Sequence, residues 1–301
     1  MTAIRAAGEA AVRRRAILCV LAASAAFSLV GALIKMVGPE VPAVESALVR
    51  GAIMGVIMFE LLRRKNGGRV VWRTRRPWSH LMRTLCGFFG MVSAYYGYTH
   101  LPLAANTALG FAMPLVLTAL CGPFLGERVG WQRGGAVIAG MVGVLIMVRP
   151  WNVTDTALPL WPVAIVLGGV VAWAGAMISI RRLGMQGESN EAILLYYSLG
   201  SVILATGFVI PVWVTPSPLA LAGMVGAALI STGAQLLMTE GYRTGEATVV
   251  APFEYGAILY TTLLGLLLWG EIPDRWSWVG IAVIVASGLY VWRTEARPAA
   301  K

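Results

Sequence analysis

Glu254 is the residue whose type and position point most directly to chemistry. It lies about two turns inside a long apolar stretch, residues 247–269, and Pro252 stands two positions before it. An ionisable side chain in such a stretch is costly to bury and usually has a function. Burial favours the protonated form of a carboxylate, so Glu254 can carry a proton or bind a cationic group. The structural alternative is an ion pair with an arginine, or contact with water near the end of the stretch.

Other polar side chains also lie inside apolar stretches. The amides of Asn106 and Gln235 can line a cavity, or they can form hydrogen bonds between helices. Arg50 can hold a structural ion pair or bind an anionic group, and the structural role is favoured. Arg83 lies one turn inside its stretch, and we expect its guanidinium to extend to the surface.

Aromatic and proline residues suggest the walls and hinges of a cavity. The aromatic candidates for a cavity wall are Phe27, Tyr95, Tyr98, Trp173 and Tyr255. Ordinary packing, or a place in the aromatic belt at the membrane surface, is the alternative for each of them. Pro114 and Pro252 fall within or near the start of apolar stretches, where a proline bends a helix and frees a carbonyl group. We therefore predict hinges at both prolines.

Glu127 and Glu271 each follow a glycine at the end of an apolar stretch. Their shared setting predicts a structural role, such as capping the next helix. The sequence contains no phosphate-binding loop, no cluster with the spacing of metal ligands and no Ser-His-Asp set. These patterns predict neither an enzyme nor an ATP-driven pump, and they predict no metal and no cofactor.

The composition indicates an integral membrane protein. Of the 301 residues, 58% are hydrophobic and 13% are charged, whereas a soluble domain carries about 25% charged residues. Ten apolar stretches are each long enough to cross the bilayer as a helix. They are 16–37, 43–62, 79–99, 104–125, 131–149, 160–180, 191–213, 218–242, 247–269 and 276–292. The fold class expected is all-α, with ten transmembrane helices.

The chain repeats itself. Gly97-Tyr98 recurs as Gly241-Tyr242 and Gly126-Glu127 as Gly270-Glu271, both at an offset of 144 residues. The halves, 16–150 and 160–293, hold five stretches each. Because five is odd, the second half must cross the membrane in the opposite sense. Inverted repeats are typical of secondary transporters, whose substrate site lies between the repeats near the middle of the bilayer.

The net charge of +10 reflects membrane orientation rather than a nucleic-acid partner. With the N-terminus in the cytoplasm, 19 of the 24 Lys and Arg residues fall on the cytoplasmic side. The positive-inside rule thus places both termini in the cytoplasm. We expect a multi-pass protein of a bacterial-type inner membrane. A cleaved signal peptide after Arg13-Arg14-Arg15 is the alternative for the first stretch.

These halves resemble the EamA branch of the drug/metabolite transporter superfamily. The matching features are Pro114, Gly126-Glu127 and the Gly-rich stretch after them, their counterparts from Gly241 to Arg293, and Arg50. Two short segments, Ala251–Tyr255 and Trp269–Pro273, resemble riboflavin and S-adenosylmethionine uptake carriers. The resemblance implies a central cavity between helices 1, 3, 4, 6, 8 and 9.

The function expected is secondary transport of a small, amino-acid-like organic metabolite by alternating access, with a proton as a candidate coupling ion. Riboflavin or S-adenosylmethionine uptake is the alternative within transport, and a membrane enzyme or scaffold is the alternative outside it. Gly135, Ala139 and Gly143 recur at four-residue spacing, which permits close helix contact. That contact can be internal or can form a homodimer.

Overall fold

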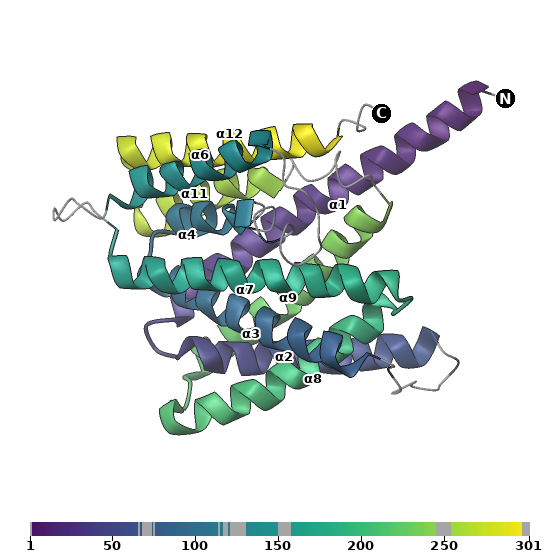
Figure 1. Ribbon diagram of the computed structural model, residues 1–301. Helices are drawn as coiled ribbons and strands as arrows, with labels where there is room; N and C mark the ends of the chain where they lie inside the picture. Colours follow the sequence, from purple (N-terminus) through teal and green to yellow (C-terminus); the bar gives the residue numbers. More distant parts are fainter. Residues whose placement is uncertain are drawn as a thin grey trace. The chain divides into compact units, whose positions relative to one another are not determined.

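A computed structural model describes residues 2–65, 67, 74, 76–113, 115, 116, 120, 131–149, 158–244 and 254–296. All regular structure in these ranges is helical (Figure 1). In chain order the helices are α1 (Thr2–Val37), α2 (Ala43–Lys65), α3 (Pro77–His100), α4 (Leu103–Gly110), α6 (Trp131–Val148), α7 (Leu160–Met185), α8 (Asn190–Val209), the 3-10 helix η1 (Ile210–Val212), α9 (Pro218–Thr244), α11 (Gly256–Trp269) and α12 (Arg275–Ala296).

The all-α prediction is confirmed, and each expected apolar stretch contains a described helix. Within the described ranges, four segments are both long and apolar enough to cross a membrane. They are Arg14–Val37, Leu160–Ile180, Asn190–Val212 and Pro218–Met238. Side chains define the start of two helices. Ser189 caps α8, because its hydroxyl oxygen accepts from the Ala192 N–H at 3.3 Å, and Pro77 is the first residue of α3.

Backbone contacts divide the chain into two compact units. Unit 1 comprises Met1–Ala32, Pro102–Leu158 and Ile230–Lys301, and unit 2 comprises Leu33–Leu101 and Pro159–Leu229. Each unit combines segments from both halves of the sequence. Helices α1 and α9 contribute one end to each unit.

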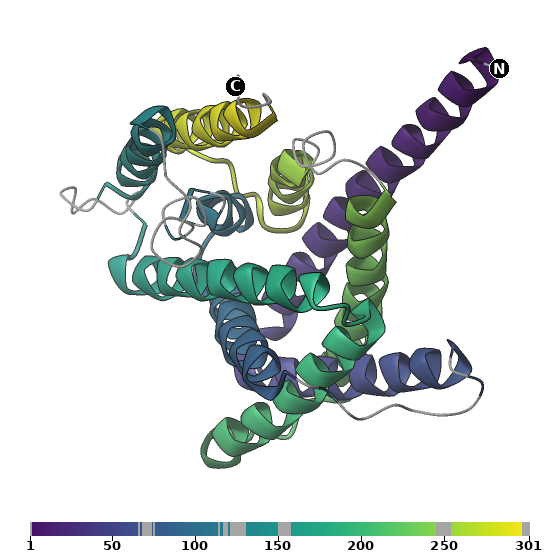
Figure 2. The same ribbon diagram turned by 45° about the vertical axis from the view of Figure 1, so that its right-hand side comes forward.

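In unit 1, helix α6 packs along α12 and α4 packs along α11. Figure 2 shows the teal α6 beside the yellow α12 in a second view. The first part of α1 packs against the last part of α9 at Gly241, where a Cβ would lie 2.6 Å from Cγ2 of Val20. Small residues thus let the helix backbones approach closely.

Gly143, the last of the three small residues spaced along α6, makes a close contact inside the chain. A Cβ on Gly143 would lie 3.0 Å from the carbonyl oxygen of Gly280 in α12. A Cβ on Gly280 would lie 2.7 Å from the carbonyl oxygen of Gly143 and 2.7 Å from Cβ of Met147. The atoms that a Cβ on Gly280 would meet belong to the backbone or are a first side-chain carbon, so a side chain at Gly280 forces the helices apart.

Gly280→Ala is therefore expected to lower the free energy of unfolding by about 1–3 kcal/mol, the usual cost of overpacking. Gly135→Ala is the matched control, because Gly135 is the repeat counterpart of Gly280 and its added Cβ meets nothing within 4 Å. Melting temperatures in one detergent measure both effects. Equal melting temperatures for the two variants would contradict the assigned contact.

In unit 2, helix α3 packs along α7 and α8, and α2 packs along α8. A buried cluster fills the space between α2 and α8; its members are Met54, Met58, Leu62, Leu194, Leu195 and Tyr197. The first part of α9 also belongs to unit 2 and packs on the end of α1. A Cβ at Gly223 would lie 2.7 Å from Cγ2 of Val37 there.

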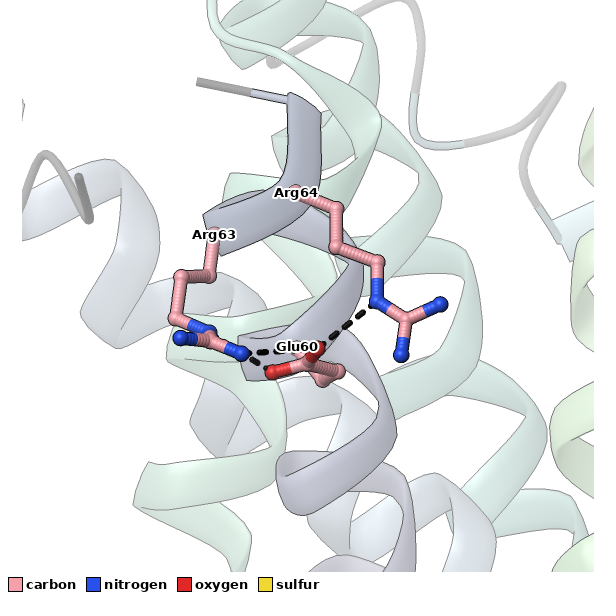
Figure 3. A network of polar contacts seen from close by, with 3 residues as sticks. All are labelled: Glu60, Arg63 and Arg64. Carbon is pink, nitrogen blue, oxygen red and sulfur yellow. Dashed lines mark hydrogen bonds and ion pairs between the residues drawn. The ribbon is translucent and has the colours of Figure 1, made fainter. Parts of the chain in front are cut away.

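The last turns of α2 carry the basic cluster that the orientation prediction uses. Figure 3 shows the Glu60 carboxylate between Arg63 and Arg64. Glu60 accepts from Nε of Arg63 at 2.7 Å and from Nε of Arg64 at 2.7 Å. These groups are exposed, so the pairs add little to stability. Glu60 does reduce the net positive charge of this helix end.

Candidate functional site

One cavity of about 280 Å³ lies at an end of unit 1. Its walls come from the start of α4, from α11, from the turn after α11 and from the start of α12. Most of the lining is apolar, and the polar members are Thr261, Thr262, Glu271, Asp274 and Ser277. A mainly apolar cavity with a few converging polar groups is the usual form of a small-molecule site.

The turn between α11 and α12 places Glu271 at this cavity. Gly270 ends α11 with φ 68°, a left-handed conformation that glycine adopts without strain. The Gly270 and Glu271 N–H groups then donate to the carbonyls of Leu266 and Gly265, both at 3.0 Å. Oε2 of Glu271 accepts from the N–H of Leu103 at 3.0 Å, at the first residue of α4. Glu271 therefore caps α4 of the other half.

Glu271 was predicted to cap the helix that follows it, but its hydrogen bond caps α4 instead. Asp274 caps the following helix, because its Oδ1 accepts from the Ser277 N–H at 2.8 Å at the start of α12. A negative side chain at a helix N-terminus also interacts favourably with the helix dipole. The hydrogen bond of Glu271 joins α4 to the α11–α12 turn, and a structural role for this residue stays a prediction.

Asp274 also forms an ion pair across the two halves. Its Oδ2 lies 2.6 Å from Nη2 of Arg149, which follows α6 and is only 7% exposed. Burial disfavours the Asp274 carboxylate, but the hydrogen bonds from Ser277 and the Arg149 charge outweigh it and lower the pKa of Asp274 below its ordinary value. The Asp274 carboxylate therefore stays ionised at neutral pH.

Five of the predicted cavity residues lie in unit 1: Phe27, Asn106, Gln235, Glu254 and Tyr255. Asn106 is buried in α4, whereas Phe27, Gln235, Glu254 and Tyr255 are half-buried. The Tyr255 ring lies 4.7 Å from the Phe111 ring, centroid to centroid. Its hydroxyl contacts Gly288 of α12 so closely that no side chain fits there. Tyr255 thus joins α11 to both α12 and the segment after α4.

Tyr95, Trp173 and Arg50 lie in unit 2. Arg50 is 6% exposed, and its Nη1 contacts Sδ of Met91. Trp173 is 36% exposed, and its Cβ lines the close contact of α7 with Gly90. Tyr95 is buried in α3. Tyr98 also lies in α3 of unit 2, so the eight predicted cavity residues are divided between the units, five and three.

Arg83 corrects another expectation, since it does not extend to the surface. It is 6% exposed, and its Cζ lies 4.1 Å from the centroid of the Tyr197 ring. The Tyr197 hydroxyl lies 3.5 Å from Sδ of Met91, the atom that Arg50 contacts. A cation over an aromatic face is attracted to it, which favours this buried position. The sequence indicates nothing about Tyr197, because its partner in α3 is 114 residues away.

Three predicted residues, Pro114, Glu127 and Pro252, lie outside the described residues. Among the described residues, no group of three or more His, Cys, Asp or Glu side chains is arranged to hold a metal ion. The two described carboxylates at the unit 1 cavity act instead on helix starts and on Arg149.

Comparison with known proteins gives the family. The model of the EamA-like transporter family matches the chain twice, at residues 14–149 and 160–293. The chain belongs to the EamA-like transporter family. It is accordingly a multi-pass membrane protein with a transport function rather than an enzyme, and its resemblance to the drug/metabolite transporter superfamily is confirmed.

Individual EamA-like relatives differ in their named substrates. A riboflavin transporter of Rhizobium johnstonii is 30% identical, over 80% of this chain and 78% of its own. The pseudopaline exporter CntI of Pseudomonas aeruginosa is 28% identical, over 93% and 96%. An S-adenosylmethionine uptake transporter of Rickettsia prowazekii is 27% identical, over 76% of each. A solved structure aligns with a TM-score of 0.63 at 18% identity, over 95% of this chain and 99% of its own, which supports the fold alone.

Proposed function

We propose that this chain is a secondary active transporter that moves a small organic metabolite by alternating access. The observation that carries the proposal is the pairing of equivalent helices from the two halves. The second helices pair as α2 with α8, the fourth as α4 with α11, and the fifth as α6 with α12. The first helix of each half packs on the third of the other, α7 on α3 and α1 on α9.

This pattern is unchanged when the two halves are exchanged, as a two-fold relation requires. It supports repeats at 16–150 and 160–293, and the double family match supports the same division. Five helices per repeat make the relation an inverted one. Inverted repeats give a carrier two related ends that can open in turn.

The orientation follows from the charge distribution, with both termini proposed in the cytoplasm. In that orientation the unit 1 cavity, which the start of α4 and the turn between α11 and α12 line, lies at the outer face. A C-terminal fusion to a reporter that works only in the cytoplasm should be active. Activity from a periplasm-dependent reporter alone would reverse the orientation.

Riboflavin and S-adenosylmethionine are the first substrates to test, because relatives that carry their names match three-quarters or more of the chain. Amino-acid-like solutes form the next group. Purified protein in proteoliposomes, preloaded with unlabelled solute, should accumulate the same labelled solute by counterflow. Exchange of any one solute supports a carrier, and the direction of net flow follows from a second assay with an imposed gradient.

The same assay separates transport from the alternatives. An enzyme would convert the labelled solute into a product, and a scaffold would leave it outside the vesicles unchanged. Failure of every solute to exchange, in vesicles whose protein is shown to be folded by its melting transition, would argue against the proposal.

A further inference from the structure

A surface groove of about 430 Å³ runs along α1 in unit 1 and is separate from the cavity described above. Its lining comprises Arg14, Arg15, Leu18, Cys19 and Ala22 of α1, with Leu237 of α9. The two arginines are exposed, and they are the only charged members of the lining. Leu18, next along α1, is 54% exposed although it lies in an apolar helix.

The lining residues of α1 form one stripe. Residues three, four, seven and eight positions apart share a helix face, so the arginines, then Leu18 and Cys19, then Ala22 follow one another along the axis. At 1.5 Å per residue the stripe is about 12 Å long. It is charged at one end and apolar along the rest, the same division that a phospholipid has.

The walls of the groove are held by packing. Ala16 and Val20 of α1 are fully buried and pack with Met238 of α9. Gly241 brings the two backbones close, since a Cβ there would lie 3.1 Å from the carbonyl oxygen of Ala16. The groove therefore follows the edge of a close helix contact, and its width is set by that contact.

We propose that this groove binds an anionic phospholipid, with the headgroup phosphate at Arg14 and Arg15 and an acyl chain against Leu18, Ala22 and Leu237. Basic residues at the end of a membrane helix attract anionic headgroups, and the apolar stripe lies where acyl chains surround the protein. This binding is independent of which solute the chain transports.

Charge selects an anionic lipid over a zwitterionic one. Arg15 lies 3.4 Å from Oε1 of Glu240, so one carboxylate partly offsets the two guanidinium groups. One net positive charge remains among these three groups. It favours a headgroup with net charge −1, such as phosphatidylglycerol, over phosphatidylcholine, whose phosphate is balanced by its own cation.

Native mass spectrometry of the full chain, released from detergent micelles that hold equal amounts of phosphatidylglycerol and phosphatidylcholine, tests the proposal. The wild-type protein should retain phosphatidylglycerol about fivefold more than phosphatidylcholine, from about 1 kcal/mol for one net charge near the surface. The double variant Arg14→Gln/Arg15→Gln should retain the two lipids about equally. Arg182→Gln, which removes an exposed arginine at the end of α7 in unit 2, should keep the wild-type ratio.

A second variant tests the apolar part of the groove. Ala22 is exposed, so Ala22→Phe should fold and should fill the groove while leaving both arginines in place. It should lower the amount of retained phosphatidylglycerol. Equal retention of both lipids by the wild type, or a ratio that survives in the double arginine variant, would overturn the proposal. So would full retention of lipid in Ala22→Phe, since the acyl chain would then lie elsewhere.

Discussion

Glu254→Gln is expected to reduce transport at least tenfold while the protein stays folded. Glu254 is half-buried in a 3-10 turn directly before α11, and its neighbour Tyr255 packs against Phe111 and α12. Glutamine has nearly the same shape as glutamate but carries no charge, so it removes the cost of burying a carboxylate. A tenfold loss corresponds to about 1.4 kcal/mol of lost interaction in the rate-limiting state.

The form of the loss separates two roles for Glu254. If the carboxylate carries a coupling proton, Glu254→Gln should retain counterflow exchange and lose its response to a pH gradient. If it binds a cationic group of the substrate, exchange should fail as well. Glu60→Gln is the control, because Glu60 is a carboxylate held by exposed arginines at the end of α2. Normal transport by Glu254→Gln under both conditions would make the residue structural.

Arg149→Gln is expected to open the unit 1 cavity to membrane-impermeant reagents. Arg149 and Asp274 join the two halves of the sequence by a short, partly buried ion pair, and the loss of one partner leaves the other charge without compensation. We expect the closed form to lose about 1–2 kcal/mol, which raises the population of the open form about tenfold. In a variant whose native cysteines are replaced, Ala105→Cys in the cavity lining should then react about tenfold faster with a membrane-impermeant thiol reagent.

The repeat supplies the control for this ion pair. Arg293 is the counterpart of Arg149, and it is exposed. The positions that correspond to Asp274 in the first half are occupied by Val129 and Gly130, so Arg293 has no carboxylate at the equivalent position. Arg293→Gln should leave the labelling rate unchanged. A double-mutant cycle with Asp274→Asn, which keeps a good helix cap, isolates the coupling between the two side chains. A coupling energy near zero would show that the ion pair between Arg149 and Asp274 does not keep the unit 1 cavity closed.

The sequence predicted the helices well because each one is a long apolar stretch, a local property. The recurrence of Gly-Glu in both halves predicts a structural role for Glu271, and its hydrogen bond to the N–H of Leu103 supports that role. The sequence did not identify the partner of Glu271, because Leu103 is 168 residues away and only the fold brings them together. Arg83 was misassigned for a related reason. Its distance from the end of α3 suggests a surface position, whereas an aromatic ring on α8 provides a buried one.

The sequence did not predict the unit 1 cavity, because nothing in it marks Asp274 and Ser277 as part of a site. Asp274 and Ser277 look like an ordinary helix start, and only the position of Arg149 shows that Asp274 also joins the two halves of the sequence. The aromatic and amide residues chosen for a cavity are divided between the units, so their joint role stays a prediction.

The hydrogen bond from Leu103 to Glu271 means that one half of the chain completes a helix belonging to the other. Residues 16–150 made as a separate polypeptide would begin α4 with an N–H group that has lost its carboxylate acceptor. Such a half is expected to be stable only beside a second half of opposite orientation. If the halves are inverted repeats, as proposed above, a gene encoding a single repeat had to insert its product into the membrane in both directions before the two copies were fused.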